Sequence, residues 1–190
     1  LVIQASKLKE EGKTFEEALD ELAADGGTIK LAKNVTIPYN KDLTWPGSLF
    51  IRADDDDVIT LDLNGCTITG SYNPNQEGPE DEPQYLATII VYKGTLNIVN
   101  SSATVGRVQG ARDDVNEGYG CAVQQANTGK VNIYSGYYDG SVLFDPEGED
   151  ALLVSGGWFS GYIYEDQEFN PENFDLPLAD DYTVEQDGDY

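Results

Sequence analysis

Aromatic side chains near the end of the chain are the residues best suited to bind a sugar. The segments GYYDG and GWFSG align with an offset of 21 residues, which places Tyr137 level with Trp158 and Tyr138 level with Phe159. Side chains alternate between the two faces of a strand, so one pair faces inward and the other outward. Because Phe is the more apolar residue, we predict that Tyr138 and Phe159 lie in the core.

The outward pair and two later tyrosines would then form an exposed platform on which a sugar ring can stack. The platform residues are Tyr137, Trp158, Tyr162 and Tyr164. The alternative is that the aromatic pairs only stabilise neighbouring strands, or lie beneath the C-terminal tail.

Two acidic runs carry the oxygen ligands that Ca²⁺ prefers. They are ADDDDV and DPEGED, with Asp54, Asp55, Asp56, Asp57, Asp145, Glu147, Glu149 and Asp150 as the candidate ligands. Neither run has the spacing of an EF-hand loop, and consecutive aspartates point in different directions. We therefore expect solvated loop charge, with a calcium site as the alternative and no other cofactor.

Several kinds of catalytic site are excluded by composition. The chain contains no His, which rules out Ser-His-Asp and Cys-His nucleophiles and the usual Cys/His zinc sites. It has no Walker A motif and no dinucleotide fingerprint. Carboxylates are so numerous that no pair stands out for glycoside hydrolysis. The two cysteines, Cys66 and Cys121, are interpreted as small buried apolar residues, and a disulfide between them stays open.

The charge of the chain is strongly negative. Thirty-five acidic residues against 11 basic ones give a net charge of −24, and no Lys or Arg follows Lys130. Such a surface repels nucleic-acid phosphates and anionic membranes. No apolar run approaches the roughly 18–20 residues of a membrane span. We expect no nucleic-acid partner and no membrane insertion.

One helix is predicted, at the start of the chain. In TFEE, Thr14 and Glu17 form a capping box, apolar residues follow at helical spacing, and Gly26 and Gly27 end the segment. We expect a helix over 14–24 that covers one end of the core. The next segment, GGTIKLAKNVTI, changes to a period of two with Ile29 and Leu31 on one face.

From residue 59 onward a short phrase recurs. Aligning its closing polar turn places Asn64, Asn100, Ser135 and Ser155 in register, at spacings of 36, 35 and 20 residues. The apolar pairs before these turns are Leu61 and Leu63, Leu96 and Ile98, Val131 and Ile133, and Leu152 and Val154. Gly94 and Gly129 repeat at the same spacing. Self-similarity of this kind indicates stacked β-coils with two or three short strands each and loops of variable length.

With these phrases aligned, the chain resembles the right-handed parallel β-helix (pectin-lyase-like) surface and secreted proteins of gut bacteria and their phages. The matching segments include GGTIKLAKNVTI, ITLDLNGCTITGS, GTLNIVNSS, KVNIYSGYYDG and ALLVSGGWFSG. The resemblance implies an all-β, right-handed parallel β-helix with an N-terminal capping helix. We expect one domain over 1–190, with the helix at 14–24, coils over 27–165 and an acidic C-terminal cap or tail over 166–190.

Enzymes in that group use clustered Asp with calcium and a basic residue, which draws attention to GRVQGARDDVN. Its Arg107, Arg112, Asp113 and Asp114 could supply the base and the cations of a polysaccharide lyase. The alternative is that these four residues form ordinary surface ion pairs, each worth about 0–1 kcal/mol. The negative charge of the chain also argues against binding of polyanionic pectin.

The sequence therefore predicts a non-enzymatic module, extracellular or on a bacterial cell surface, for adhesion or glycan contact along one solenoid face. Its partners would be glycans or other surface protein chains, and it could be oligomeric. One alternative is a structural fibre or decoration module of a virion or cell surface. The other is a weak polysaccharide lyase or hydrolase.

Overall fold

Short parallel strands and tight corners build the part of the chain that the structure describes. The structure, a computed structural model, describes residues 2–4, 27–40, 42, 47–71, 87–113, 118–145, 147–148, 150–160 and 175–185. These residues are all-β and contain no α-helix. The predicted helix at 14–24 lies outside the described residues. No helix in the described part is long and apolar enough to cross a membrane.

Three parallel sheets contain most of the strands. Sheet A is ordered β1 (Val2–Gln4), β2 (Gly27–Lys30), β5 (Val58–Asp62), β8 (Thr95–Val99), β13 (Lys130–Ile133) and β16 (Leu152–Val154). Sheet B is ordered β3 (Val35–Thr36), β6 (Thr67–Thr69), β9 (Arg107–Gln109), β14 (Tyr137–Asp139) and β17 (Trp158–Phe159). Sheet C is ordered β4 (Leu49–Arg52), β7 (Ile89–Lys93), β12 (Val123–Gln125) and β15 (Val142–Leu143).

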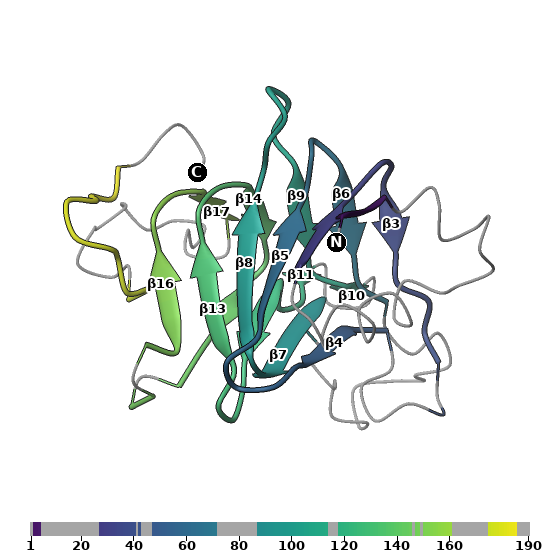
Figure 1. The fold of residues 1–190 in the computed structure, drawn as a ribbon. Helices are drawn as coiled ribbons and strands as arrows, with labels where there is room; N and C mark the ends of the chain where they lie inside the picture. The colour runs from purple at the N-terminus through teal and green to yellow at the C-terminus, as the bar shows by residue number, and fades with distance from the viewer. Residues whose placement is uncertain are drawn as a thin grey trace.

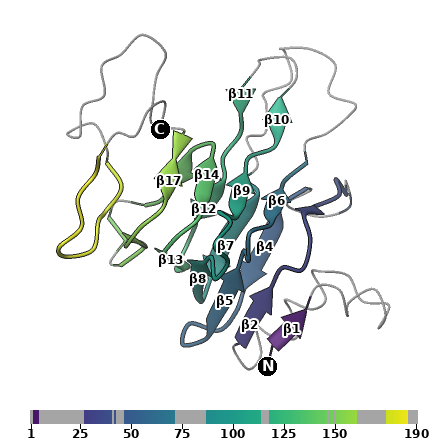
Figure 2. The same ribbon diagram turned by 90° about the horizontal axis from the view of Figure 1, so that it is seen from above.

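The chain visits the sheets in the order C, A, B, and then begins again one strand further along. Thus β4, β5 and β6 form one coil, and β7, β8 and β9 form the next. Figure 1 shows the coils following one another from the N-terminal to the C-terminal side. This arrangement of stacked parallel sheets is compatible with a β-solenoid. Between β9 and β12, the antiparallel pair β10 (Arg112–Asp113) and β11 (Gly118–Tyr119) stands away from the three sheets (Figure 2).

The core is a set of apolar columns inside the coils. Leu96 of β8 pairs with Val131 of β13, which pairs with Leu152 of β16, and all three are buried. The predicted pairing of these apolar residues is confirmed, but the predicted alignment of Ser155 with Ser135 is wrong by one residue, because β13 and β16 pair at an offset of 21. Stacking places each aliphatic side chain above another of similar size, so every coil buries its apolar face against its neighbours. A lone coil has no such partner.

The predicted pairing of the first two apolar residues is wrong by two positions, and the predicted alignment of Asn64 with Asn100 is wrong by one, because β5 and β8 pair at an offset of 37. Ile59, not Leu61, pairs with Leu96, and Leu61 pairs with Ile98. A shift of two residues keeps every side chain on the same face of a strand, so the apolar period fits either register. The alignment matched the turns by their asparagines, but β5 is followed by a differently shaped corner, in which Leu63 is also fully buried.

Residues 175–179 pair along the outer edge of sheet A. The Val154 N–H donates to the Pro177 carbonyl, and the Ala179 N–H donates to the Val154 carbonyl, both at 2.8 Å. Leu178 forms a parallel bridge with Val154, and Leu176 is 3% exposed within the core. This segment of the C-terminal tail therefore extends the core beyond β16.

Both cysteines are free thiols. Cys121 is buried, and its one S–H has two carbonyl acceptors within reach, that of Val123 at 3.1 Å and that of Ser141 at 3.2 Å from Sγ. It belongs to a small apolar cluster with Ala87 and Ile90. Cys66 is only partly buried. The disulfide that the sequence left open is absent.

Candidate functional site

The outer face of sheet B gathers the aromatic residues that the sequence singled out. Val108 and Tyr138 are fully buried, so their strand neighbours point to the other face. Strand pairing arranges those neighbours in two rows across the sheet. The aromatic row is Thr67, Arg107, Tyr137 and Trp158. The polar row is Thr69, Gln109, Asp139 and Ser160.

The predicted pairing of the aromatic residues is confirmed. Tyr137 pairs with Trp158, and Tyr138 pairs with Phe159. Tyr138 is fully buried, and Phe159 packs against the core with its ring 5.0 Å from the Tyr138 ring. Trp158 is 42% exposed, as expected of a platform residue.

Tyr137 is the exception, because only 8% of it is exposed. The predicted exposure of Tyr137 is therefore wrong. The Arg107 guanidinium carbon lies 4.4 Å from the centre of the Tyr137 ring, in a cation–π contact that covers it. Arg107 lies on the neighbouring strand β9, and Trp158, on the other side of Tyr137 in the row, keeps open surface. Tyr162 and Tyr164 lie outside the described residues.

A chain of hydrogen bonds fixes the polar row beside these rings. The Gln109 Nε2 donates to Asp139 Oδ2 at 3.3 Å, and the Ser160 Oγ donates to Asp139 Oδ1 at 2.9 Å. Thr69 Oγ1 donates to Gln109 Oε1 at 3.3 Å. Asp139 is 8% exposed. An exposed indole next to a fixed row of hydroxyl, amide and carboxylate groups can stack on a sugar and hydrogen-bond to its hydroxyls.

The sequence interpretation grouped Arg107 with Arg112 and two aspartates and did not predict strand β9. Arg107 instead belongs to a sheet and points over Tyr137. Arg112 and Asp113 form the separate hairpin strand β10, and Asp114 lies outside the described residues. A signal for β9 was present, because GRVQG has the same G-x-x-x-G frame as GYYDG and GWFSG.

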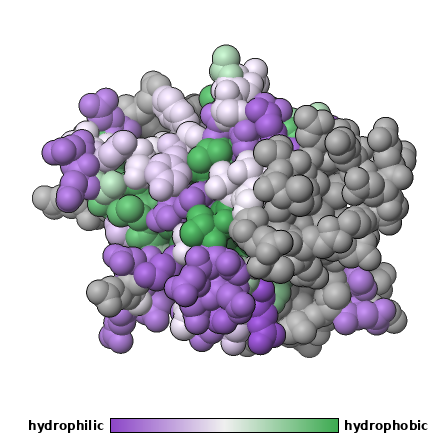
Figure 3. All heavy atoms as spheres, in the orientation of Figure 1, coloured by the Kyte–Doolittle hydropathy of each residue, from purple (hydrophilic) through white to green (hydrophobic). Residues whose placement is uncertain are grey.

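The first acidic run lies at the turn that leads from sheet C to sheet A. Lys93 Nζ lies 3.3 Å from Asp54 Oδ1 and 3.7 Å from Asp55 Oδ2. The Asp54 N–H donates to Asp57 Oδ2 at 3.3 Å, and Thr128 Oγ1 donates to Asp55 Oδ1 at 3.2 Å. Side chains of this turn are well exposed, and the lower edge of the molecule in Figure 3, where the turns into β5, β8 and β13 lie, is hydrophilic.

Carboxylates of the second run are likewise engaged locally. Asp145 Oδ1 accepts from the Glu147 N–H at 3.0 Å, and Asp150 Oδ2 lies 3.7 Å from Lys130 Nζ. Asp56 is exposed, and Glu149 lies outside the described residues. Across the described ranges, no three Asp, Glu or Cys residues come close enough together to hold a metal ion.

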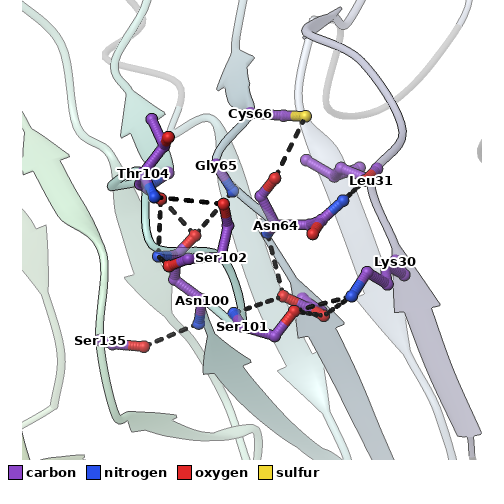
Figure 4. Close-up of polar contacts among 12 residues, drawn as sticks. Lys30, Leu31, Asn64, Gly65, Cys66, Asn100, Ser101, Ser102, Thr104 and Ser135 are labelled. Carbon is purple, nitrogen blue, oxygen red and sulfur yellow. Dashed lines mark hydrogen bonds and ion pairs between the residues drawn. The ribbon is translucent and has the colours of Figure 1, made fainter.

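The turns that lead from sheet A to sheet B, here called the A–B corner, hold a buried polar network that the sequence did not predict (Figure 4). Asp62 is 5% exposed. Its Oδ1 accepts from the N–H groups of Asn64 at 3.0 Å and Ser101 at 2.9 Å, and its Oδ2 accepts from Ser101 Oγ at 2.6 Å. Lys30 Nζ lies 3.3 Å from Asp62 Oδ2.

These contacts set the charge state of Asp62. Burial alone would raise its pKa, but the hydrogen bonds from Ser101, from the Asn64 N–H and from Lys30 outweigh burial and lower the pKa below the ordinary 3.8. Asp62 therefore stays ionised and joins three successive coils through Lys30, its own strand and Ser101.

Asn100 is the second centre of the A–B corner. Its Oδ1 accepts from the N–H groups of Gly65 at 2.7 Å and Gly106 at 3.1 Å. Its Nδ2 donates to the carbonyls of Ser102 at 2.9 Å and Thr104 at 3.0 Å. Every polar position of the amide is occupied, so this side chain works as an internal brace and has no capacity left for a ligand.

Comparison with known proteins adds no identification. No protein-family model matches the chain, and neither a curated protein nor a solved structure does.

Proposed function

We propose that the chain is a non-enzymatic extracellular module that contacts glycans along the outer face of sheet B. The observation that carries the proposal is Trp158, a 42% exposed indole in line with Tyr137 and beside the hydrogen-bonded polar row. Flat apolar rings with adjacent polar groups suit a sugar, whose ring faces are apolar and whose edges carry hydroxyls. A bacterial cell surface is the proposed location, with a virion as the alternative.

The same face argues against an enzyme. Asp139 has each carboxylate oxygen engaged, one by Gln109 and one by Ser160. Arg107 is stacked on Tyr137, and within the described ranges it forms no ion pair with a carboxylate that could act as a base. A lyase needs a base and a cation that converge on one substrate position. We propose binding without catalysis.

The solenoid is proposed to wind right-handedly, with a helix over 14–24 at its N-terminal end. Connections between parallel strands of one sheet are right-handed in nearly all proteins, because the strand twist favours that hand. The coil order C, A, B repeats such connections several times.

A glycan array on the purified chain tests the proposed function, with calcium and again with a chelator. Trp158→Ala should abolish binding. The matched control is Leu153→Ala, since Leu153 is similarly exposed at 38% but lies in sheet A. Absence of binding to any glycan would refute the proposal, and equal loss in both variants would place the site elsewhere. Loss of glycan binding in the presence of chelator, with binding retained in calcium, would indicate a calcium site at the acidic turns.

A structural role is the second candidate, favoured by the outer face of sheet A. Three large apolar side chains are exposed on its strands or directly after them: Val58 at 44%, Tyr134 at 46% and Leu153 at 38%. Figure 3 views this side and shows apolar surface among the polar groups. A face of this kind could pack on another protein chain. This candidate predicts that the wild-type chain sediments as an oligomer. An oligomer together with a glycan array that shows no binding would favour the structural role over glycan binding.

A further inference from the structure

The chain contains a single Asn-Gly dipeptide, Asn64–Gly65, and it lies in the A–B corner. In a flexible peptide, Asn followed by Gly is the pair most prone to deamidation. The Gly nitrogen attacks the Asn side-chain carbonyl carbon easily because Gly has no Cβ to obstruct the approach. The local structure of this corner therefore decides whether the reaction occurs.

In the A–B corner, the attacking Gly65 nitrogen and the Asn64 side-chain amide are both held by hydrogen bonds to neighbouring coils. The Gly65 N–H donates to Asn100 Oδ1 at 2.7 Å, so the attacking nitrogen is hydrogen-bonded to the next coil. The Asn64 Nδ2, which would leave as ammonia, donates to the Leu31 carbonyl at 2.8 Å on the preceding coil. Asn64 and Gly65 have φ angles of 48° and 77°, a tight turn that the stacked coils fix on both sides.

We propose that Asn64–Gly65 is a latent deamidation site and that Asn100 keeps it unreactive. In the reaction, the Gly65 nitrogen bonds to the Asn64 side-chain carbon, and the bond to Nδ2 breaks. Ammonia leaves, carrying the proton of the Gly65 N–H, and a cyclic succinimide forms. Water then opens the ring at either carbonyl and yields aspartate or isoaspartate at position 64.

Either product damages the stack. A carboxylate at position 64 has no N–H to donate to the Leu31 carbonyl, which then faces a negative charge. Isoaspartate also lengthens the backbone between β5 and β6, which changes the registers in which the two strands pair with the next coil. Deamidation at this corner would therefore accumulate in proportion to the time that the coils spend locally open, and it would make reclosure harder.

The experiment incubates the native chain at mildly alkaline pH and follows deamidation at position 64 by peptide mass mapping. The same chain in concentrated guanidinium chloride gives the unprotected rate. Native protein should deamidate far more slowly. Asn100→Ser, kept under native conditions, should react roughly fivefold faster than wild type, the factor that one lost hydrogen bond of ordinary strength produces. Asn100→Asp keeps an oxygen acceptor for the Gly65 N–H and should retain most of the protection.

Ser135→Ala is the matched control. It removes the hydroxyl that accepts from the Asn100 N–H at 2.7 Å but leaves the Asn100–Gly65 contact in place. Acceleration in Asn100→Ser without acceleration in Ser135→Ala supports the proposal. Equal acceleration in both would overturn the specific role of Asn100. Equal rates in native and denatured wild type would overturn protection altogether, and that comparison needs no variant to fold.

Discussion

The ring of Tyr138 lies flat against the ring of Phe159, with centroids 5.0 Å apart and planes inclined by 12°. The two residues are paired neighbours in sheet B, so the stack joins β14 to β17 inside the core. Tyr138 is fully buried, and its hydroxyl donates to the Ser135 carbonyl at 3.0 Å. The contact thus joins the coil that contains β17 to the coil before it.

Truncating Tyr138 should therefore be costly. Tyr138→Ala is expected to lower the free energy of unfolding by about 3–5 kcal/mol, the usual cost of removing a buried aromatic side chain. Tyr138→Phe loses only the hydrogen bond to Ser135 and should cost about 1 kcal/mol. Urea unfolding followed by tryptophan fluorescence measures both. If Tyr138→Phe proved as damaging as Tyr138→Ala, the hydroxyl and not the stack would be the stabilising feature.

Sequence reasoning recovered the parts of the fold that depend on period and residue size. The pairing of Leu96, Val131 and Leu152 follows from repeated apolar pairs, and that of Tyr138 with Phe159 follows from two matching glycine frames. It failed where two registers satisfy one pattern. Ile59, Leu61 and Leu63 all face inward, so either Ile59 or Leu61 could pair with Leu96 without changing which side chains are buried. Only the contacts with the next coil select between these two registers.

Polar details of the site were harder to foresee. Tyr137 was expected to be open, but it is buried and contacts Arg107, which comes from a strand 30 residues earlier and reaches the ring only because the coils stack. Asp62 looked like one more charge in an acidic chain. Its burial arises from Ser101 and Lys30, residues contributed by the coils on either side. Such contacts are non-local, and a single sequence does not encode them in any short pattern.

Gly129 should not tolerate a side chain. A Cβ at this position would lie 2.2 Å from the Val91 carbonyl oxygen, a backbone atom of the preceding coil that cannot move aside. We expect Gly129→Ala to destabilise the chain by about 3 kcal/mol, at the upper end of ordinary overpacking. Gly148→Ala is the control, since it lies in an exposed turn and its Cβ would come no closer than 3.0 Å to the Ala151 side chain and 3.3 Å to the Asp145 carbonyl oxygen. Similar urea midpoints for the two variants would contradict the close approach of the coils.

The two thiols should differ sharply in reactivity. Burial raises the pKa of Cys121 from the ordinary 9.0 to about 11, despite hydrogen bonds that its sulfur makes in the core. Near neutral pH its thiolate is scarce and shielded, so Ellman's reagent should modify Cys66 first in the native chain and both residues at once in denaturant. Single Cys→Ser variants assign each phase. A Cys121 that reacted as fast as Cys66 in the native chain would show that the small apolar cluster around Cys121 opens readily.

The same thiol makes stability depend on alkaline pH. Because the folded pKa is raised, the contribution of Cys121 is intact below pH 9.0 and is lost as pH rises from there through about 11. Wild type should therefore lose stability over this interval relative to Cys121→Ala, which has no thiol to ionise. The free energy of unfolding of both chains is measured by urea unfolding at each pH. If it falls equally with pH in the two chains, ionisation of Cys121 is not the cause of the loss of stability.

Asp62 should make stability depend on acid pH in the opposite sense. Its pKa is lowered in the folded chain, so its contribution is fully present above the ordinary 3.8 and is lost as pH falls through the folded value. At neutral pH, Asp62→Asn should cost about 1.5–3 kcal/mol, since hydrogen bonds to a charged group are stronger than neutral ones. The difference between variant and wild type should shrink as the pH drops below 3.8. Asp56→Asn, at an exposed position, should be nearly neutral throughout. A difference for Asp62→Asn that stayed constant from neutral to acid pH would mean that shape, and not charge, makes Asp62 important to the A–B corner.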